Sequence, residues 1–72
     1  MGEDDLLEPA EASEHLRELG LPHTVATLAK LRVVGGGPKY LVIGRRIRYR
    51  RYRLREYVDG RTREMASTSA SA

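Results

Sequence analysis

The sequence predicts a small α+β domain in which two short helices precede a two-stranded β-hairpin and a third helix follows it. Three observations predict this order. Apolar residues recur at helical spacing in the first third of the chain, a glycine-proline break occupies residues 35–38, and a strictly alternating stretch at residues 46–50 follows a glycine. With 72 residues the chain can bury only a thin core. We expect one folded domain over residues 7–60.

The first predicted helix begins at Pro9, because proline fits the first helical turn, where its missing N–H costs nothing. Gly20 ends it, since glycine readily takes the left-handed conformation that terminates helices. The residues at helical spacing on one face are Ala12, His15, Leu16 and Leu19. Residues 1–6 ahead of this helix are rich in acid, and we expect them to form a flexible lead-in.

The second helix is predicted over residues 25–33, with Thr24 as its N-cap and the glycine break as its end. On a helical wheel, the inner side holds Val25, Leu28, Leu31 and the stem of Arg32. The opposite side and its flank hold Ala26, Thr27, Lys30 and Val33. Lys30 is central on this outward side.

A β-hairpin is predicted where the segments 39–43 and 46–50 flank Gly44. Because successive strand side chains alternate in direction, Ile47 and Tyr49 point one way and the arginines around them point the other. The pairing of the two strands depends on the length of the loop between them.

Two loop lengths lead to different pairings. A two-residue loop places Val42 opposite Ile47, and a three-residue loop places Ile43 there. We expect the three-residue loop, which turns Leu41 and Ile43 inward beside Ile47 and Tyr49.

Leu54, Tyr57 and Val58 have the spacing of a short third helix that ends near Gly60. The remaining residues, 61–72, are expected to form a disordered tail. The order is therefore helix, turn, helix, hairpin, helix, which is the outline of a winged helix-turn-helix. In that fold the second helix can lie in the major groove of DNA, and the hairpin, or wing, can follow the backbone or enter the neighbouring minor groove.

Charge is distributed very unevenly along the chain. Residues 1–20 carry a net charge of −6, and residues 21–72 carry +9. Seven arginines lie between Arg45 and Arg55, and no acid interrupts them. So many like charges repel one another unless something anionic meets them, which favours nucleic acid as the partner. The candidate DNA-binding residues are Thr24, Ala26, Thr27, Lys30, Arg32, Arg45, Arg46, Arg48, Arg50, Arg51 and Arg53.

The sequence supports some of these residues as DNA contacts better than others. Arg45 and Arg46 at the hairpin tip are the best of them. Arg32 can bind phosphate or cover the edge of the core with its stem, and Thr27 can touch a base edge or close the start of the helix.

At these motifs the chain resembles the excisionase-type, MerR-like winged helix-turn-helix proteins of bacteria and their mobile elements. The resemblance rests on "EPAEASEHL" in the first helix, "TLAKLR" in the second, "GGGP", the wing "IGRRIRY", and Leu54 with Tyr57, and it covers about residues 6–60. It implies binding to double-stranded DNA, with the second helix in the major groove. Members act as transcription regulators or as recombination directionality factors (excisionases).

The chain departs from the family pattern at three places. The turn "RELGLPH" is longer than in the shortest members, and Glu8 stands where a capping Ser or Thr is usual. Tyr52 and Arg53 stand where members often carry Ser-Asp or a similar cap for the last helix. That change removes a cap, at about 1 kcal/mol, and adds positive charge. Our hypothesis is that Arg51 and Arg53 at the start of this helix grip phosphate.

The outward side of the second helix is short and poor in polar groups, so one molecule should discriminate weakly between sequences. We therefore expect further copies of the protein on adjacent DNA sites, or bending of the DNA. Candidate protein partners are an integrase or RNA polymerase, and the expected location is the cytoplasm, at the nucleoid. The apolar runs are too short to span a membrane. Neither enzymatic activity nor a cofactor or metal site is expected, because the chain lacks a placed nucleophile and a metal-ligand cluster.

Two other readings remain open at this point. In one, the protein is an interaction module whose acidic first helix docks on a basic partner. In the other it binds RNA, although the sheet lacks the aromatic surface that stacks unpaired bases.

Overall fold

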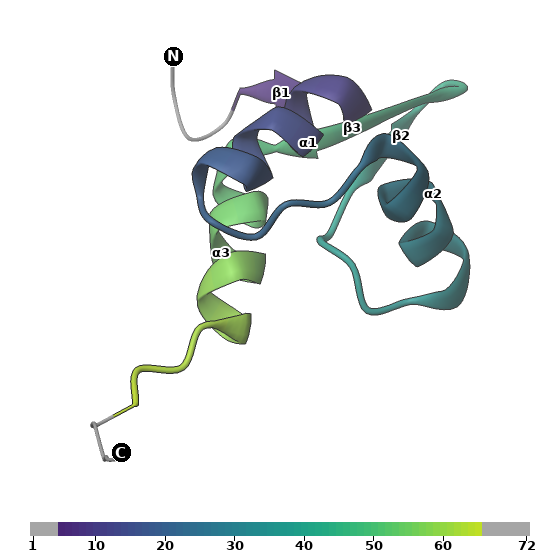
Figure 1. The fold of residues 1–72 in the computed structure, drawn as a ribbon. Coiled ribbons are helices and arrows are strands. Elements are labelled where there is room, and N and C mark those ends of the chain that lie inside the picture. Colours follow the sequence, from purple (N-terminus) through teal and green to yellow (C-terminus); the bar gives the residue numbers. More distant parts are fainter. Residues whose placement is uncertain (1–4, 66–72) are drawn as a thin grey trace.

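The computed structural model describes residues 5–65, and its three helices and three-stranded antiparallel sheet confirm the predicted α+β class. The elements in chain order are β1 (Leu6–Leu7), α1 (Pro9–Glu18), α2 (Val25–Val34), β2 (Leu41–Ile43), β3 (Arg46–Arg50) and α3 (Arg51–Arg61) (Figure 1). This arrangement is compatible with a small winged-helix fold, in which β2 and β3 form the wing. No helix within residues 5–65 is long and apolar enough to cross a membrane.

The sheet has one strand more than the sequence predicts. Strand β1 pairs antiparallel with β3, placing Leu6 opposite Arg50 and Leu7 opposite Tyr49, so that the strand order is β1-β3-β2. Leu6 therefore belongs to the fold and not to a flexible lead-in, while residues 1–4 lie outside the described residues. A two-residue strand has no readable periodicity, and its physical basis is the hydrogen-bonding edge that β3 would otherwise leave open.

The predicted three-residue hairpin loop is wrong. Val42 lies opposite Ile47, so the loop contains two residues, Gly44 and Arg45. Gly44 has a φ of 64° and Arg45 does not have a positive φ, which is the pattern of a type II′ turn. Such a turn matches the right-handed twist of the strands, and this favours the shorter loop.

The shorter loop also turns two apolar side chains away from the core. Leu41 pairs with Arg48 and Ile43 with Arg46, so both lie on the arginine face of the sheet and not on the inner face where we expected them. Ile43 is 49% exposed.

Two glycine substitutions test the backbone of this fold with opposite expected signs. Gly44→Ala should destabilise the protein by about 1 kcal/mol, because the added Cβ meets open space and the whole cost is the left-handed backbone. Gly60→Ala should stabilise it by roughly 0.5 kcal/mol, because Gly60 lies within α3 and a Cβ there also meets open space. Urea unfolding measures both. Equal effects of the two changes would contradict the assigned turn.

The core lies where α1 meets α2, α3 and β3. Its buried members are Leu7, Ala12, Leu16, Leu28, Tyr49 and Leu54. Leu19, Ile47, Tyr57 and Val58 pack around it, partly buried. The predicted inner face of the first helix is thus confirmed at Ala12 and Leu16, and Leu19 packs against them.

Helix α2 buries a narrower strip than its helical wheel predicts. Leu28 is fully buried, but Val25, which we expected on the inner side, is 45% exposed. The reason is that α2 packs mainly on α1, so that only residues close to Leu28 are covered. Thr24 caps the helix as predicted, accepting a hydrogen bond from the backbone N–H of Thr27 at 3.1 Å.

Candidate nucleic-acid interface

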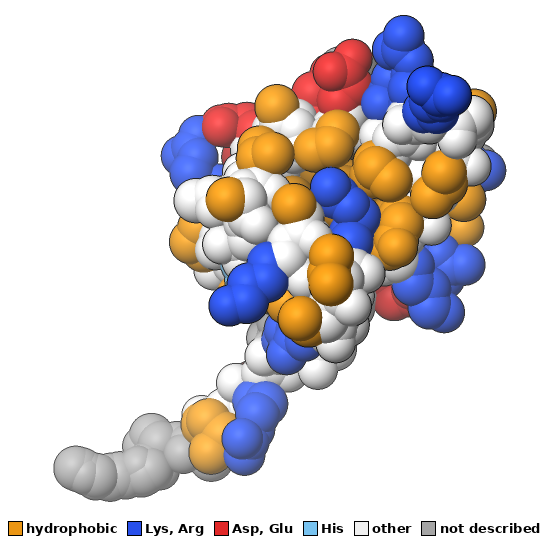
Figure 2. All heavy atoms as spheres, turned by 90° about the vertical axis from the view of Figure 1, so that its right-hand side faces the viewer, with side chains coloured by type: hydrophobic (Ala, Val, Ile, Leu, Met, Phe, Trp, Pro, Cys, Tyr) orange, Lys and Arg blue, Asp and Glu red, His pale blue; other side chains and the backbone are white. Residues whose placement is uncertain are grey.

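The hairpin tip and α2 project toward the same side of the molecule, the right-hand side of Figure 1. Figure 2 shows this side face on. Lys and Arg side chains lie at its upper edge, near its centre and on both flanks, and hydrophobic side chains gather between them. The surface is therefore cationic at separate points and apolar in between.

The tip of the hairpin carries two exposed arginines. Arg45 occupies the turn and Arg46 begins β3, and both side chains are exposed. A tight two-residue turn holds these guanidinium groups at the end of a paired hairpin, which is a geometry suited to reaching into a groove or along a phosphate backbone.

Arg48 and Arg50 follow Arg46 along one face of β3, as the alternation predicts. They are half-buried, and Arg48 donates a hydrogen bond to the carbonyl of Ile47 at 2.7 Å. Tyr49 on the opposite face is fully buried under the helices. The arginine row along β3 thus faces away from the helices, and the tip is the part of the hairpin nearest to the side on which α2 projects.

The outward side of α2 offers little for reading bases. Ala26 and Lys30 are exposed, as predicted. Thr24 and Thr27 are engaged with each other through their hydroxyls and the helix cap. Farther along the helix, Val33 is 85% exposed, and Val34, which is also apolar, is exposed as well. Lys30 is the exposed cation of this helix.

Arg32 lies against the core. It donates from Nη1 to the hydroxyl of Tyr49 at 2.7 Å, and its guanidinium lies 5.9 Å from the ring centroid of Tyr40. Its side chain therefore satisfies the buried hydroxyl of Tyr49 and lies near the exposed ring of Tyr40. This is the core-edge role, one of the two alternatives that its sequence position left open.

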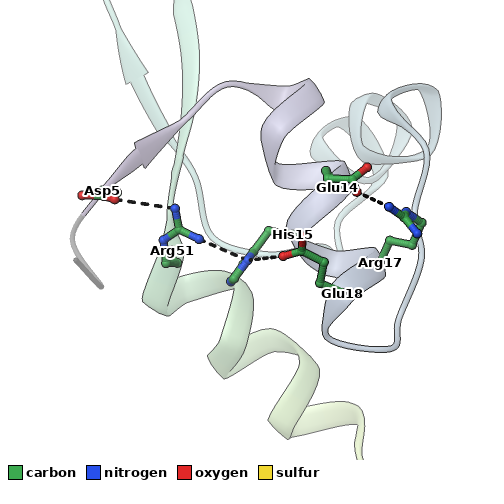
Figure 3. Close-up of polar contacts among 6 residues, drawn as sticks. All are labelled: Asp5, Glu14, His15, Arg17, Glu18 and Arg51. Carbon is green, nitrogen blue, oxygen red and sulfur yellow. Dashed lines mark hydrogen bonds and ion pairs between the residues drawn. The ribbon is translucent and has the colours of Figure 1, made fainter. Parts of the chain in front are cut away.

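Arg51 is the centre of a polar cluster that joins three segments (Figure 3). Its guanidinium lies 3.5 Å from Oδ2 of Asp5 and 3.3 Å from Nδ1 of His15, which is itself 3.7 Å from Oε1 of Glu18. The backbone N–H of Arg51 also donates to the carbonyl of Asp5 at 3.1 Å. The side chain is 24% exposed, so Arg51 fastens the start of the chain and α1 to the start of α3.

Arg51→Ala should therefore act on stability more than on DNA binding. We expect a loss of about 1 kcal/mol, because the contacts are charge-assisted but partly exposed. Urea unfolding checks the first expectation, and duplex affinity measured well below the unfolding transition checks the second. A variant of normal stability with a strongly reduced salt dependence of DNA binding would instead make Arg51 a phosphate contact.

The start of α3 differs from the expected cap position. The N-cap is Arg50, two residues before Tyr52, and its side chain makes no capping hydrogen bond. Arg53 donates to Oε1 of Glu56 at 3.0 Å, and its guanidinium lies 5.0 Å from the ring centroid of Tyr52. The hydrogen bond to Glu56 raises the pKa of Arg53 above its ordinary value. Arg53 is thus oriented at the surface and fully charged.

Lys39 is a surface cation that the sequence reasoning did not single out. It is exposed and shares a pocket with Arg50 and Arg53. Its position directly after the glycine-proline break could have indicated this role. A segment that leads into the first strand of a hairpin lies close to the end of the second strand, where Arg50 is found.

The exposed surface of α1 is acidic. Glu11, Glu14 and Glu18 are exposed, and Glu14 forms an ion pair with Arg17 on the same helix. This pairing raises the pKa of Arg17 through its hydrogen bond to Glu14. Residues 5–65 contain no group of three His, Asp or Glu side chains placed to hold a metal ion.

Comparison with known proteins adds no relationship to this geometry. No protein-family model matches the chain, and the search of curated proteins gave no significant match.

Proposed function

We propose that this protein binds double-stranded DNA as a winged helix-turn-helix protein. The observation that carries the proposal is the common direction of the arginine-bearing hairpin tip and the exposed side of α2 (Figure 1). With ten residues α2 is about 15 Å long, and the major groove of B-DNA admits a helix of this kind. The wing would then contact the neighbouring backbone or minor groove.

In this arrangement the arginines supply most of the affinity. Arg45 and Arg46 neutralise phosphates and release counterions, and Lys30 adds a contact from the helix. The apolar outward side of α2, including the exposed Val33, limits hydrogen-bond readout of base edges and leaves contacts with thymine methyl groups. We infer that specificity comes from several copies on adjacent sites or from the deformability of the DNA.

The resemblance noted from the sequence suggests two cellular roles for such a protein in bacteria or their mobile elements. One is a recombination directionality factor that works with an integrase, and the other is a transcription regulator that meets RNA polymerase. Both roles place the protein in the cytoplasm, at the nucleoid. Genome-wide mapping of bound sites separates them, because clustering at an attachment site supports the first and clustering at promoters supports the second.

The binding proposal itself is tested by gel shifts on duplex DNA, single-stranded DNA and duplex RNA over a series of salt concentrations. We expect preference for duplex DNA, and for about six engaged phosphates log K should fall with log salt at a slope of about −5. Preference for RNA would support the RNA-binding alternative. Indifference to all three nucleic acids would contradict the proposal and favour a protein partner for the acidic surface of α1.

A further inference from the structure

A small pocket lies between the segment that leads into β2 and the junction of β3 with α3. It has a volume of about 170 Å³. The residues that line it are Lys39, Tyr40, Leu41, Arg50, Tyr52 and Arg53. Half of these side chains are cationic and none is a carboxylate.

The three cations of the pocket come from three different parts of the fold. Lys39 precedes β2, Arg50 ends β3, and Arg53 lies in the first turn of α3. Their convergence is a product of the tertiary structure, because about ten residues of wing separate the first from the other two. An anion placed in the pocket would be attracted by all three positive charges.

The remaining walls give the pocket its shape. Tyr40, Leu41 and Tyr52 contribute apolar surface, which lowers the local dielectric and strengthens charge-assisted hydrogen bonds. Arg53 is held over the ring of Tyr52 and by Glu56, so its planar fork of donors loses little further freedom when it binds an anion. The volume is smaller than the 300–1,000 Å³ or so of sites for drug-sized ligands, so the pocket fits one compact anionic group.

We propose that this pocket binds a phosphate group. Guanidinium groups match the oxygens of phosphate through paired hydrogen bonds, and a lysine adds a point charge. Two sources supply the same chemistry: a phosphodiester of the DNA backbone or a free phosphate. The first case rests on the proposed function, and the second is independent of it.

Titration with inorganic phosphate, followed by heteronuclear NMR, tests the pocket in the full-length protein. We expect the amide signals of Lys39, Tyr52 and Arg53 to shift together and to saturate. Lys39→Gln and Arg53→Gln should each weaken the phosphate affinity about tenfold, the effect of one lost charge-assisted hydrogen bond. Arg63→Gln, a change of the same charge at an exposed site after α3, should leave the affinity unchanged. Lys39→Gln alters an exposed side chain, so it keeps the test valid if Arg53→Gln perturbs the fold.

A second arm identifies the source of the phosphate. If a DNA phosphate occupies the pocket, Lys39→Gln should reduce the salt slope of duplex binding by about 1. If free phosphate is the ligand, the same variant loses phosphate affinity while the duplex slope stays as in the wild type. Shifts spread evenly over all arginines, or phosphate affinity unaltered in both pocket variants, would overturn the pocket. If phosphate does not bind in the pocket but the protein still binds duplex DNA, this inference is wrong and the proposed function stands. If phosphate binds in the pocket but duplex DNA does not bind, only the proposed function is wrong.

Discussion

Replacing Arg45 and Arg46 together with glutamine should weaken duplex binding by about 60-fold at about 0.1 M salt. Each phosphate contact contributes about 0.9 to the slope of log K against log salt, so two lost contacts reduce that slope by about 2. A salt concentration of about 0.1 M lies one decade below 1 M. Over that decade, a slope change of about 2 × 0.9 corresponds to a roughly 60-fold change in affinity. Fluorescence anisotropy with a labelled duplex measures both the affinity and the slope.

The matched control is the double variant Arg17→Gln/Arg63→Gln, which removes the same charge from α1 and from the segment after α3. These side chains lie outside the surface that we assign to DNA. The control should lose only a few-fold in affinity. If both double variants lose affinity equally, net charge alone governs binding and the hairpin tip has no special role.

Tyr49→Ala should destabilise the protein by roughly 3–5 kcal/mol, the range for loss of a large buried aromatic side chain. Tyr49 is fully buried and packs in the cluster that joins the helices to the sheet, and its hydroxyl holds the guanidinium of Arg32. So small a domain has little more stability than this in total. Most of the variant should therefore be unfolded at physiological temperature, as circular dichroism will show.

Tyr49→Phe separates the two contributions of this side chain. It keeps the ring and removes the hydrogen bond at 2.7 Å from Arg32, so the expected cost is about 1 kcal/mol. A cost for Tyr49→Ala no larger than that of Tyr49→Phe would mean that the ring is not the centre of the core.

The order of the elements could be read from the sequence because each depends on local physical rules. Pro9 and Thr24 mark the starts of helices, and the glycine-proline break ends the second helix. The alternation of side chains along β3 places Tyr49 on the inner face of the sheet. These features act within a few residues and agree with one another, which is why the fold class was accessible. The structure reproduces each of them.

The parts that the sequence could not provide depend on contacts between distant segments. Strand β1 exists because β3 offers it an edge, and the hairpin register follows from the twist preference of a two-residue turn that competes with a longer one. Leu41 and Ile43 were predicted on the inner face of the sheet because they are apolar, but they lie on the arginine face. A shift of one residue in the register moves every side chain of a strand to the other face.

The candidate site shows the same division. Exposure of Arg45, Arg46 and Lys30 follows from local pattern, and the structure places all three at the surface. Arg32 and Arg51 were also candidates for DNA binding in the sequence, but their contacts with Tyr49 and Asp5 are made across the fold and tie them to its stability. A run of arginines predicts a charge and not the partner of each member.

The central claim is that the hairpin tip and the outward side of α2 form one surface for a duplex. The most direct test is an NMR titration of the wild-type protein with a DNA duplex of about two helical turns at low salt. We predict that the signals of Ala26, Lys30, Arg45 and Arg46 shift together, while Glu14 and Glu18 on α1 stay unchanged. Shifts confined to the hairpin, or shifts centred on α1, would contradict the claim.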